Sequence, residues 1–172
     1  SFVAQQCLRL TEATAETLEQ GFFPLILSGD HSSALGSLAG IKRAHPEKTL
    51  AAIWIDAHAD LHSPYSTPSG NVHGMPLAAA LGNDNMEFKR NKVEQQALDD
   101  WETLKNMGGI TPIIKPEHLT YFGLRDYENE EAAIMEKLQI RNYPVHELRQ
   151  RIFKTCIAET LERWAEVDLI YV

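Results

Sequence analysis

The sequence is short of positive charge. Its 172 residues include 16 lysines and arginines against 24 aspartates and glutamates, a formal net charge of −8 with histidine neutral. A protein that binds nucleic acid or an anionic membrane needs a basic face, so this balance argues against both kinds of partner. We therefore expect neither a nucleic acid nor a membrane as partner.

Cysteine and long apolar runs are also scarce. The two cysteines, Cys7 and Cys156, lie in helix-like stretches with apolar neighbours, which is typical of packing residues in a reducing compartment. The longest apolar runs, such as Leu50–Ile55, are far too short to span a bilayer, and no charged-then-apolar signal segment opens the chain. These features predict a cytoplasmic protein.

Two catalytic signatures are missing. The scattered glycines, Gly36 and Gly40 among them, form no phosphate-binding loop, so nucleotide binding has little support. Asp30, His31 and Ser32 are consecutive, whereas a serine hydrolase brings its nucleophile, base and orienting group together from separate places in the fold. No Gly-x-Ser-x-Gly elbow is present either. A serine-hydrolase reading of these residues is therefore discounted.

Apolar strand-like runs alternate with helix-like segments along a chain of ordinary globular composition, 44% hydrophobic and 23% charged. Strands are predicted at residues 22–27, 50–55, 119–124, 140–144 and 167–172. Helices are predicted at residues 2–20, 32–44, 73–81, 92–105, 128–138 and 145–165, the first with Ser1 as its N-cap and Gly21 at its end. The alternation predicts a single α/β domain over residues 1–172 with a mostly parallel sheet.

Metal-binding side chains follow two of the predicted strands. The first strand is followed by S-G-D-H, which ends in His31, and the second by D-A-H-A-D, which begins at Asp56. In a parallel α/β sheet, ligands bind at the carboxyl ends of the strands. If the chain stays extended after the second strand, Asp56, His58 and Asp60 point to one side, and His31 approaches from the neighbouring strand end.

Carboxylates combined with imidazoles suit manganese, cobalt or zinc better than calcium, which prefers oxygen ligands alone. Asp56 has two oxygens and could bridge two ions. Two ions about 3.5–4 Å apart convert a bridging water into a nucleophile for hydrolysis near neutral pH. The simpler interpretation is an exposed strand end with solvated charges. It is weakened because a Gly-Asp-His segment ends the preceding predicted strand.

Three motifs in this order resemble the ureohydrolases and, among them, the arginases. They are S-G-D-H-S at residues 28–32, W-I-D-A-H-A-D at 54–60 and S-G-N-V-H-G at 69–74, and the similarity includes Y-F-G-L-R-D at 121–126. S-G-N-x-H-G separates the arginase branch from the agmatinases. The resemblance implies a three-layer α/β/α fold whose binuclear manganese centre hydrolyses L-arginine to L-ornithine and urea through a metal-bridging hydroxide. It also implies a homo-oligomer, either a trimer or a hexamer.

The resemblance implies a role for each matching residue. His31, Asp56 and Asp60 would bind the more deeply buried manganese ion. Asp56 and His58 would bind the second ion, with Asp56 bridging the two. Asp60 would also accept a hydrogen bond from the bridging hydroxide, and His73 would transfer protons at the mouth of the site.

Substrate recognition is implied for a second group of residues. Ser69 and Asn71 match residues that hold the α-carboxylate, and Glu131 matches an acidic residue that meets the α-amino group. His62 replaces a common asparagine near the carboxylate, and Glu128 replaces a common aspartate near the α-amino group. Two alternatives therefore stay open: another ureohydrolase, acting on agmatine, a guanidino acid or formiminoglutamate, or a non-catalytic metal-binding fragment.

The chain resembles only part of such an enzyme. It begins with Ser-Phe-Val inside a helix-like pattern and ends at V-D-L-I-Y-V. In the family, two further metal-binding aspartates follow directly in an Asp-x-Asp segment, and the acidic residue that pairs with the guanidinium comes later still. We therefore expect an arginase fragment without the N-terminal start or the Asp-x-Asp segment, inactive on its own.

Overall fold

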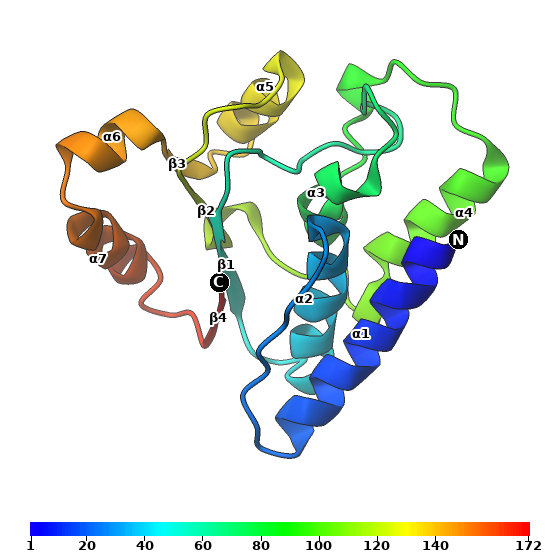
Figure 1. Cartoon of the computed structure of the whole chain (residues 1–172), viewed down its shortest axis with the longest axis horizontal. Helices are drawn as coiled ribbons and strands as arrows, with labels where there is room; N and C mark the ends of the chain where they lie inside the picture. The colour runs from blue at the N-terminus through cyan, green and yellow to red at the C-terminus, as the bar shows by residue number, and fades with distance from the viewer. The chain divides into compact units, whose positions relative to one another are not determined.

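The computed structural model describes residues 1–172 (Figure 1). The chain divides into two compact units. Unit 1 consists of Ser1–Glu47 and Asp60–Ile113, and unit 2 consists of Lys48–Ala59 and Ile114–Val172. The chain passes from unit 2 to unit 1 between Ala59 and Asp60, inside the D-A-H-A-D segment. The single domain over residues 1–172 stays a prediction.

Unit 2 contains a four-stranded parallel sheet with the strand order β3-β2-β1-β4. The strands are β1 Leu50–Ile55, β2 Leu119–Phe122, β3 Arg141–Tyr143 and β4 Leu169–Tyr171. In the central strand β1, Trp54 pairs with Tyr121 of β2, and Ala51 pairs with Ile170 of β4. The first five residues of β1 are buried, as expected for an apolar run in a parallel sheet. The predicted α/β fold with a parallel sheet is confirmed.

The helices of unit 2 are α5 Asn129–Lys137, α6 Val145–Gln150 and α7 Phe153–Arg163. A core cluster contains Cys156 of α7 and Trp164, the first residue after that helix. The same cluster contains Ile53 of β1, Phe122 of β2 and Tyr143 of β3. The rings of Phe122 and Tyr143 stack with their centroids 4.9 Å apart. The apolar face of α7 therefore covers the sheet.

The predicted helix over residues 145–165 is wrong in one respect, because it is two helices. Arg151 and Ile152 have extended backbone conformations, which separate α6 from α7. The Arg151 guanidinium forms ion pairs with Glu147 of α6 and Glu159 of α7. These ion pairs stabilise the connection between the two helices. Neither glycine nor proline marks the break, so the sequence pattern contains no signal for it.

Unit 1 contains the helices α1 Phe2–Glu19, α2 Ala34–Ala44, α3 Pro76–Ala80 and α4 Gln95–Lys105. Ser1 caps α1, its Oγ accepting a hydrogen bond from the Ala4 N–H, and Gly21 follows the helix end with φ at +80°. Both predicted helix-end residues are confirmed. Figure 1 shows α1 and α2 side by side. Single-turn 3-10 helices of unit 1 lie at His31–Ser33, Val72–Gly74, Met86–Phe88 and Met107–Gly109, and one of unit 2 lies at Pro116–His118.

Residues 22–27 do not form the predicted strand. They pair with no strand of the sheet, and Phe23, Leu25 and Leu27 are 90%, 81% and 91% exposed. An apolar run meets the side-chain requirement of a buried strand. Strand pairing also needs a hydrogen-bonded neighbour, which the local sequence does not specify. S-G-D-H therefore follows an exposed connection.

No helix combines the length and the apolar character needed to cross a membrane.

Candidate metal centre

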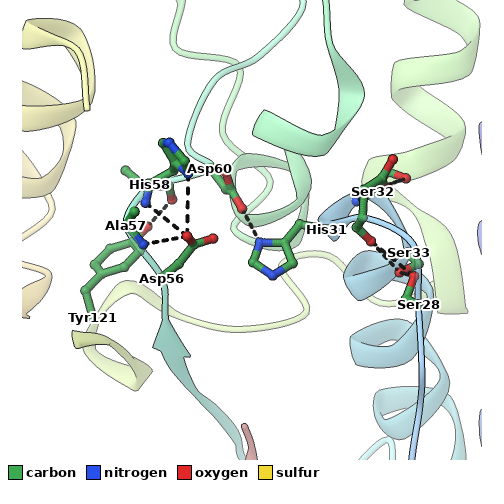
Figure 2. Close-up of polar contacts among 11 residues, drawn as sticks. Ser28, His31, Ser32, Ser33, Asp56, Ala57, His58, Asp60 and Tyr121 are labelled. Carbon is green, nitrogen blue, oxygen red and sulfur yellow. Dashed lines mark hydrogen bonds and ion pairs between the residues drawn. The ribbon is translucent and has the colours of Figure 1, made fainter. Parts of the chain in front are cut away.

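His31 and Asp60 are the two predicted metal ligands that lie in unit 1. The Nδ1 atom of His31 lies 2.9 Å from Oδ2 of Asp60, although the residues are 29 positions apart (Figure 2). Asp60 is 5% exposed and has a left-handed backbone conformation, with φ at 52°. Its carbonyl accepts a hydrogen bond of 3.1 Å from the Leu77 N–H in α3. The backbone around Asp60 therefore holds a buried carboxylate against an exposed imidazole.

Asp56 and His58 are the two predicted metal ligands that lie in unit 2, directly after β1. Oδ1 of Asp56 accepts hydrogen bonds from the N–H groups of Ala57 and His58, the second at 3.2 Å (Figure 2). The same oxygen lies 3.5 Å from Nδ1 of His58. Nε2 of His58 lies 3.5 Å from Oδ2 of Asp126, beyond the end of β2. A carboxylate and an imidazole are thus side by side after the central strand.

Hydrogen bonds from β2 and from the residues after it fix the backbone of the D-A-H-A-D segment. The Tyr121 hydroxyl donates a hydrogen bond of 2.6 Å to the Ala59 carbonyl, and both residues are fully buried. The N–H groups of Arg125 and Asp126 donate to the Ala57 carbonyl at 3.0 and 2.9 Å. Sequence reasoning missed this role for Tyr121. The available signal was a polar hydroxyl in a strand otherwise expected to be buried.

The donor chemistry fits a divalent transition-metal ion. Each unit offers one carboxylate and one imidazole, the combination that suits manganese and neighbouring metals. His31 and Asp60 already lie within hydrogen-bonding distance of each other, so an ion would replace the proton between them. Metal ligands are oriented by hydrogen bonds from surrounding groups, and the backbone contacts to Ala57 and Ala59 supply this support. A single cluster of all four predicted ligands stays a prediction, since they are divided between two units.

Asp30 fixes the turn that carries His31. Its Oδ1 accepts hydrogen bonds from the N–H and the hydroxyl of Ser32. These hydrogen bonds chiefly lower the pKa of the Asp30 carboxyl, and the charges of His73 and His31 lower it further. Partial burial opposes the shift without cancelling it. Asp30 is therefore an ionised cap of the 3-10 helix, a role that the sequence analysis did not assign.

The predicted carboxylate-binding residues and His73 lie in unit 1 on an exposed part of the chain. Ser69, Asn71 and His73 are all exposed. The Asn71 N–H donates to Oγ of Ser69 at 3.2 Å, which links the two predicted carboxylate contacts. His62 differs from them, since it is 6% exposed and its Nδ1 lies 3.3 Å from Oγ of Ser66. Three of these four side chains are therefore accessible to a ligand.

Glu128 and Glu131 form a capping box at the start of α5 in unit 2. An Oε2 atom of Glu131 accepts a hydrogen bond of 3.1 Å from the Glu128 N–H. Glu131 is buried and Glu128 is exposed. The capping box accounts for the position of Glu131 by stabilising the helix end. Contact of either residue with a substrate amino group stays a prediction.

A parallel α/β sheet whose central strand leads into carboxylate and imidazole donors is typical of metal-dependent hydrolases. The chain belongs to the Arginase family, whose model matches residues 2–172. It is 37% identical to the arginase of Bacillus caldovelox over 171 residues, 97% of this chain and 51% of that protein. Human arginase-1 (Homo sapiens) is 35% identical over 153 residues, 89% of this chain and 43% of that protein.

Solved structures show the same relationship. The crystal structure of Bacillus subtilis arginase matches with a TM-score of 0.83 at 33% identity, over 98% of this chain and 51% of that one. The Bacillus caldovelox arginase structure matches with a TM-score of 0.82 at 34% identity, over 98% and 50%. The chain spans about half the length of the arginases it matches.

Proposed function

We propose that the whole protein is a binuclear manganese hydrolase that cleaves the guanidinium group of L-arginine to give L-ornithine and urea. The observation that carries the proposal is the His31–Asp60 pair, whose Nδ1 and Oδ2 atoms are 2.9 Å apart. Asp60 belongs to the same five-residue segment as Asp56 and His58, so the chain connects both pairs of donors. Relatives at 35–37% identity named as arginases add support.

The metal ligands would be shared between the two ions. His31, Asp56 and Asp60 would hold one ion, and Asp56 and His58 would hold the second. When bound, two such ions supply a water activated for nucleophilic attack near neutral pH. Asp60 has a buried carboxylate and would accept a hydrogen bond from this nucleophile, which orients it toward the guanidinium carbon.

The side chains of unit 1 would select and process the amino acid. Ser69 and Asn71 would donate hydrogen bonds to the α-carboxylate from their exposed positions. His62 is buried and contacts Ser66. Its effect on carboxylate binding would therefore be indirect, by positioning the loop that carries Ser69. The exposed His73 imidazole would move a proton to the leaving amine, since imidazole exchanges protons near neutral pH.

The acidic pair of unit 2 would recognise the α-amino group. Glu131 and Glu128 offer negative charge at the start of α5, and an ammonium group is the complementary partner. The proposal also includes a cytoplasmic location, as the sequence features predict, and a homo-oligomer, a trimer or hexamer, as the resemblance implies. Analytical ultracentrifugation of the whole protein tests the oligomer, and a monomer would contradict it.

A substrate panel tests the proposed reaction on the whole protein loaded with manganese. Urea release is measured with L-arginine, agmatine and a guanidino acid, and formamide release with formiminoglutamate. Agmatine lacks the carboxylate that Ser69 and Asn71 would bind. A site whose polar groups are left unpaired disfavours such a ligand by orders of magnitude, so arginine should react far faster. Equal rates with agmatine would favour another ureohydrolase, and no product from any substrate would favour a non-catalytic metal-binding protein.

A matched variant separates carboxylate recognition from general damage. Ser69→Ala removes one proposed hydrogen bond to the carboxylate, so KM for arginine should rise roughly tenfold. Any residual agmatine hydrolysis should be unchanged, because agmatine has no carboxylate to lose. An equal loss with both substrates would contradict the assignment of Ser69.

A further inference from the structure

Two neighbouring segments of unit 1 lie against each other. The 63–71 loop carries Ser69 and Asn71, and residues 83–91, which we call the bracing segment, connect the region of α3 to α4. The bracing segment is polar and contains no motif that the resemblance covers. Its contacts nevertheless converge on the loop that carries the proposed carboxylate-binding residues.

Asn91, at the end of the bracing segment, makes the central contacts. Its Nδ2 donates hydrogen bonds to the carbonyls of Pro64 at 3.0 Å and Thr67 at 2.7 Å. The N–H groups of Asn91 and Arg90 both donate to the Tyr65 carbonyl, at 3.0 and 2.9 Å. One residue thus engages three carbonyls within four consecutive residues of the loop.

Thr67 carries this constraint onward to the proposed carboxylate-binding residues. Thr67 is 5% exposed, and its Oγ1 accepts hydrogen bonds from the N–H groups of Ser69 at 3.3 Å and Gly70 at 3.1 Å. Oγ of Ser69 in turn accepts a hydrogen bond from the Asn71 N–H at 3.2 Å. Asn91 therefore contacts the main chain of Thr67, and the Thr67 hydroxyl and Ser69 Oγ link that residue to Ser69 and Asn71.

Further contacts hold the bracing segment beside the start of the loop. Nδ2 of Asn85 donates to the carbonyl of Leu61, the residue directly after Asp60. The hydroxyl of Ser63 donates to the Asp84 carbonyl. The bracing segment is therefore anchored next to the candidate metal ligand as well as to the loop.

We propose that Asn91 is a positioning residue for substrate recognition, which holds the 63–71 loop so that Ser69 and Asn71 meet a carboxylate-bearing substrate. This inference rests on the proposed function. A carboxamide suits the position because its NH₂ group supplies two donors to two carbonyls. Asn91→Asp keeps the size of the side chain and replaces the NH₂ group with a carboxylate oxygen, which repels the same two carbonyls. Asn91→Ala removes the donors without adding repulsion.

Asn106 provides a matched control in the same unit. It is exposed, and its Nδ2 donates a hydrogen bond of 2.8 Å to the Glu102 carbonyl in α4. Asn106→Asp therefore makes the same chemical change at another side chain-to-backbone hydrogen bond, one that does not involve the loop. Circular dichroism first checks that both variants fold. Asn91→Ala replaces Asn91→Asp if the aspartate variant does not.

Amide hydrogen exchange tests the hold on the loop without any enzyme activity. It is measured by NMR on the 172-residue chain, at the N–H groups of Ser69, Gly70 and Asn71. These amides should exchange at least about tenfold faster in Asn91→Asp, because local opening of the loop becomes easier. Asn106→Asp should leave them unchanged. Unchanged exchange in Asn91→Asp would overturn the inference.

Steady-state kinetics of the whole protein test the effect on the substrate. Asn91→Asp should raise KM for L-arginine roughly tenfold, with kcat within about twofold and manganese content unchanged. A variant that only lowers the folded fraction would reduce kcat and leave KM alone. Faster exchange with an unchanged KM would therefore overturn the role in recognition. Absence of urea from arginine in the wild-type protein would refute the proposed function instead, and the exchange rates would still decide whether Asn91 holds the loop.

Discussion

Tyr121→Phe tests whether a hydrogen bond from β2 stabilises the backbone of the D-A-H-A-D segment. Tyr121 is 0% exposed, and its hydroxyl donates a hydrogen bond of 2.6 Å to the carbonyl of Ala59, which is also 0% exposed. Phenylalanine keeps the ring and removes the hydroxyl. Loss of one partner that leaves a buried acceptor unpaired costs about 1–3 kcal/mol, so the free energy of unfolding should fall by this amount.

Tyr143→Phe is the matched control, in the neighbouring strand of the same sheet. Tyr143 is 3% exposed, and its hydroxyl lies 3.0 Å from Oε2 of Glu159. The Glu159 side chain is 41% exposed, so water can replace the lost hydroxyl. The control should therefore lose less than about 1 kcal/mol.

Urea unfolding followed by tryptophan fluorescence measures both variants, and Trp54 is a suitable probe because it pairs with Tyr121 across the sheet. Equal m-values are needed for the comparison, since a changed m-value indicates a changed unfolded or native state. The reasoning is refuted if Tyr121→Phe costs less than about 0.5 kcal/mol or no more than Tyr143→Phe.

Three further predictions concern packing, pH dependence and catalysis. Gly40→Ala should destabilise by about 1–3 kcal/mol in urea unfolding, because a Cβ there would lie 2.6 Å from an atom of α1, whereas Gly29→Ala meets nothing within 4 Å and should be neutral. Burial lowers the pKa of Lys105, but the carboxylate of Asp84, 2.7 Å away, and a second carboxylate outweigh it and raise the pKa overall. This stabilisation is complete below the ordinary pKa of 10.5 and is lost as the pH rises above it, so unfolding free energy measured from pH 8 upward should fall there less steeply in Lys105→Met. His73→Asn should lower kcat for arginine by about 100-fold with the manganese content unchanged, and loss of metal would contradict its assignment.

The central strand and the ends of the first helix follow from local sequence patterns, whereas the break between α6 and α7 does not. The run Leu50–Ile55 predicts β1 with its observed ends, because a strand buried on both faces needs a continuous apolar stretch. Ser1 and Gly21 predict the ends of α1 by capping and backbone conformation. Residues 22–27 have the same apolar character as β1, yet they pair with no strand and most of them are exposed. A strand needs a hydrogen-bonded partner from elsewhere in the chain, and the local sequence pattern does not show whether such a partner exists.

The candidate site likewise has residues that the sequence predicts and residues that it does not. Motif spacing points to His31, Asp56, His58 and Asp60 as donors, and the structure brings His31 against Asp60 within one unit. Supporting groups such as Tyr121 and Asn91 escape sequence reasoning because they act on backbone carbonyls. Any residue type can supply such a carbonyl, so the sequence gives no sign of which one is contacted.

The most direct test of the central claim is a joint measurement of manganese content and urea release from L-arginine in the whole protein. The wild type should bind two manganese ions per chain and release urea, and removal of the metal by a chelator should abolish the reaction. Asp56→Asn should lose at least one ion and the activity, because Asp56 is the proposed bridge. Asp99→Asn, at an exposed position in α4, should keep two manganese ions and full activity. Urea release without metal, or an Asp56→Asn variant with both ions and full activity, would contradict the account.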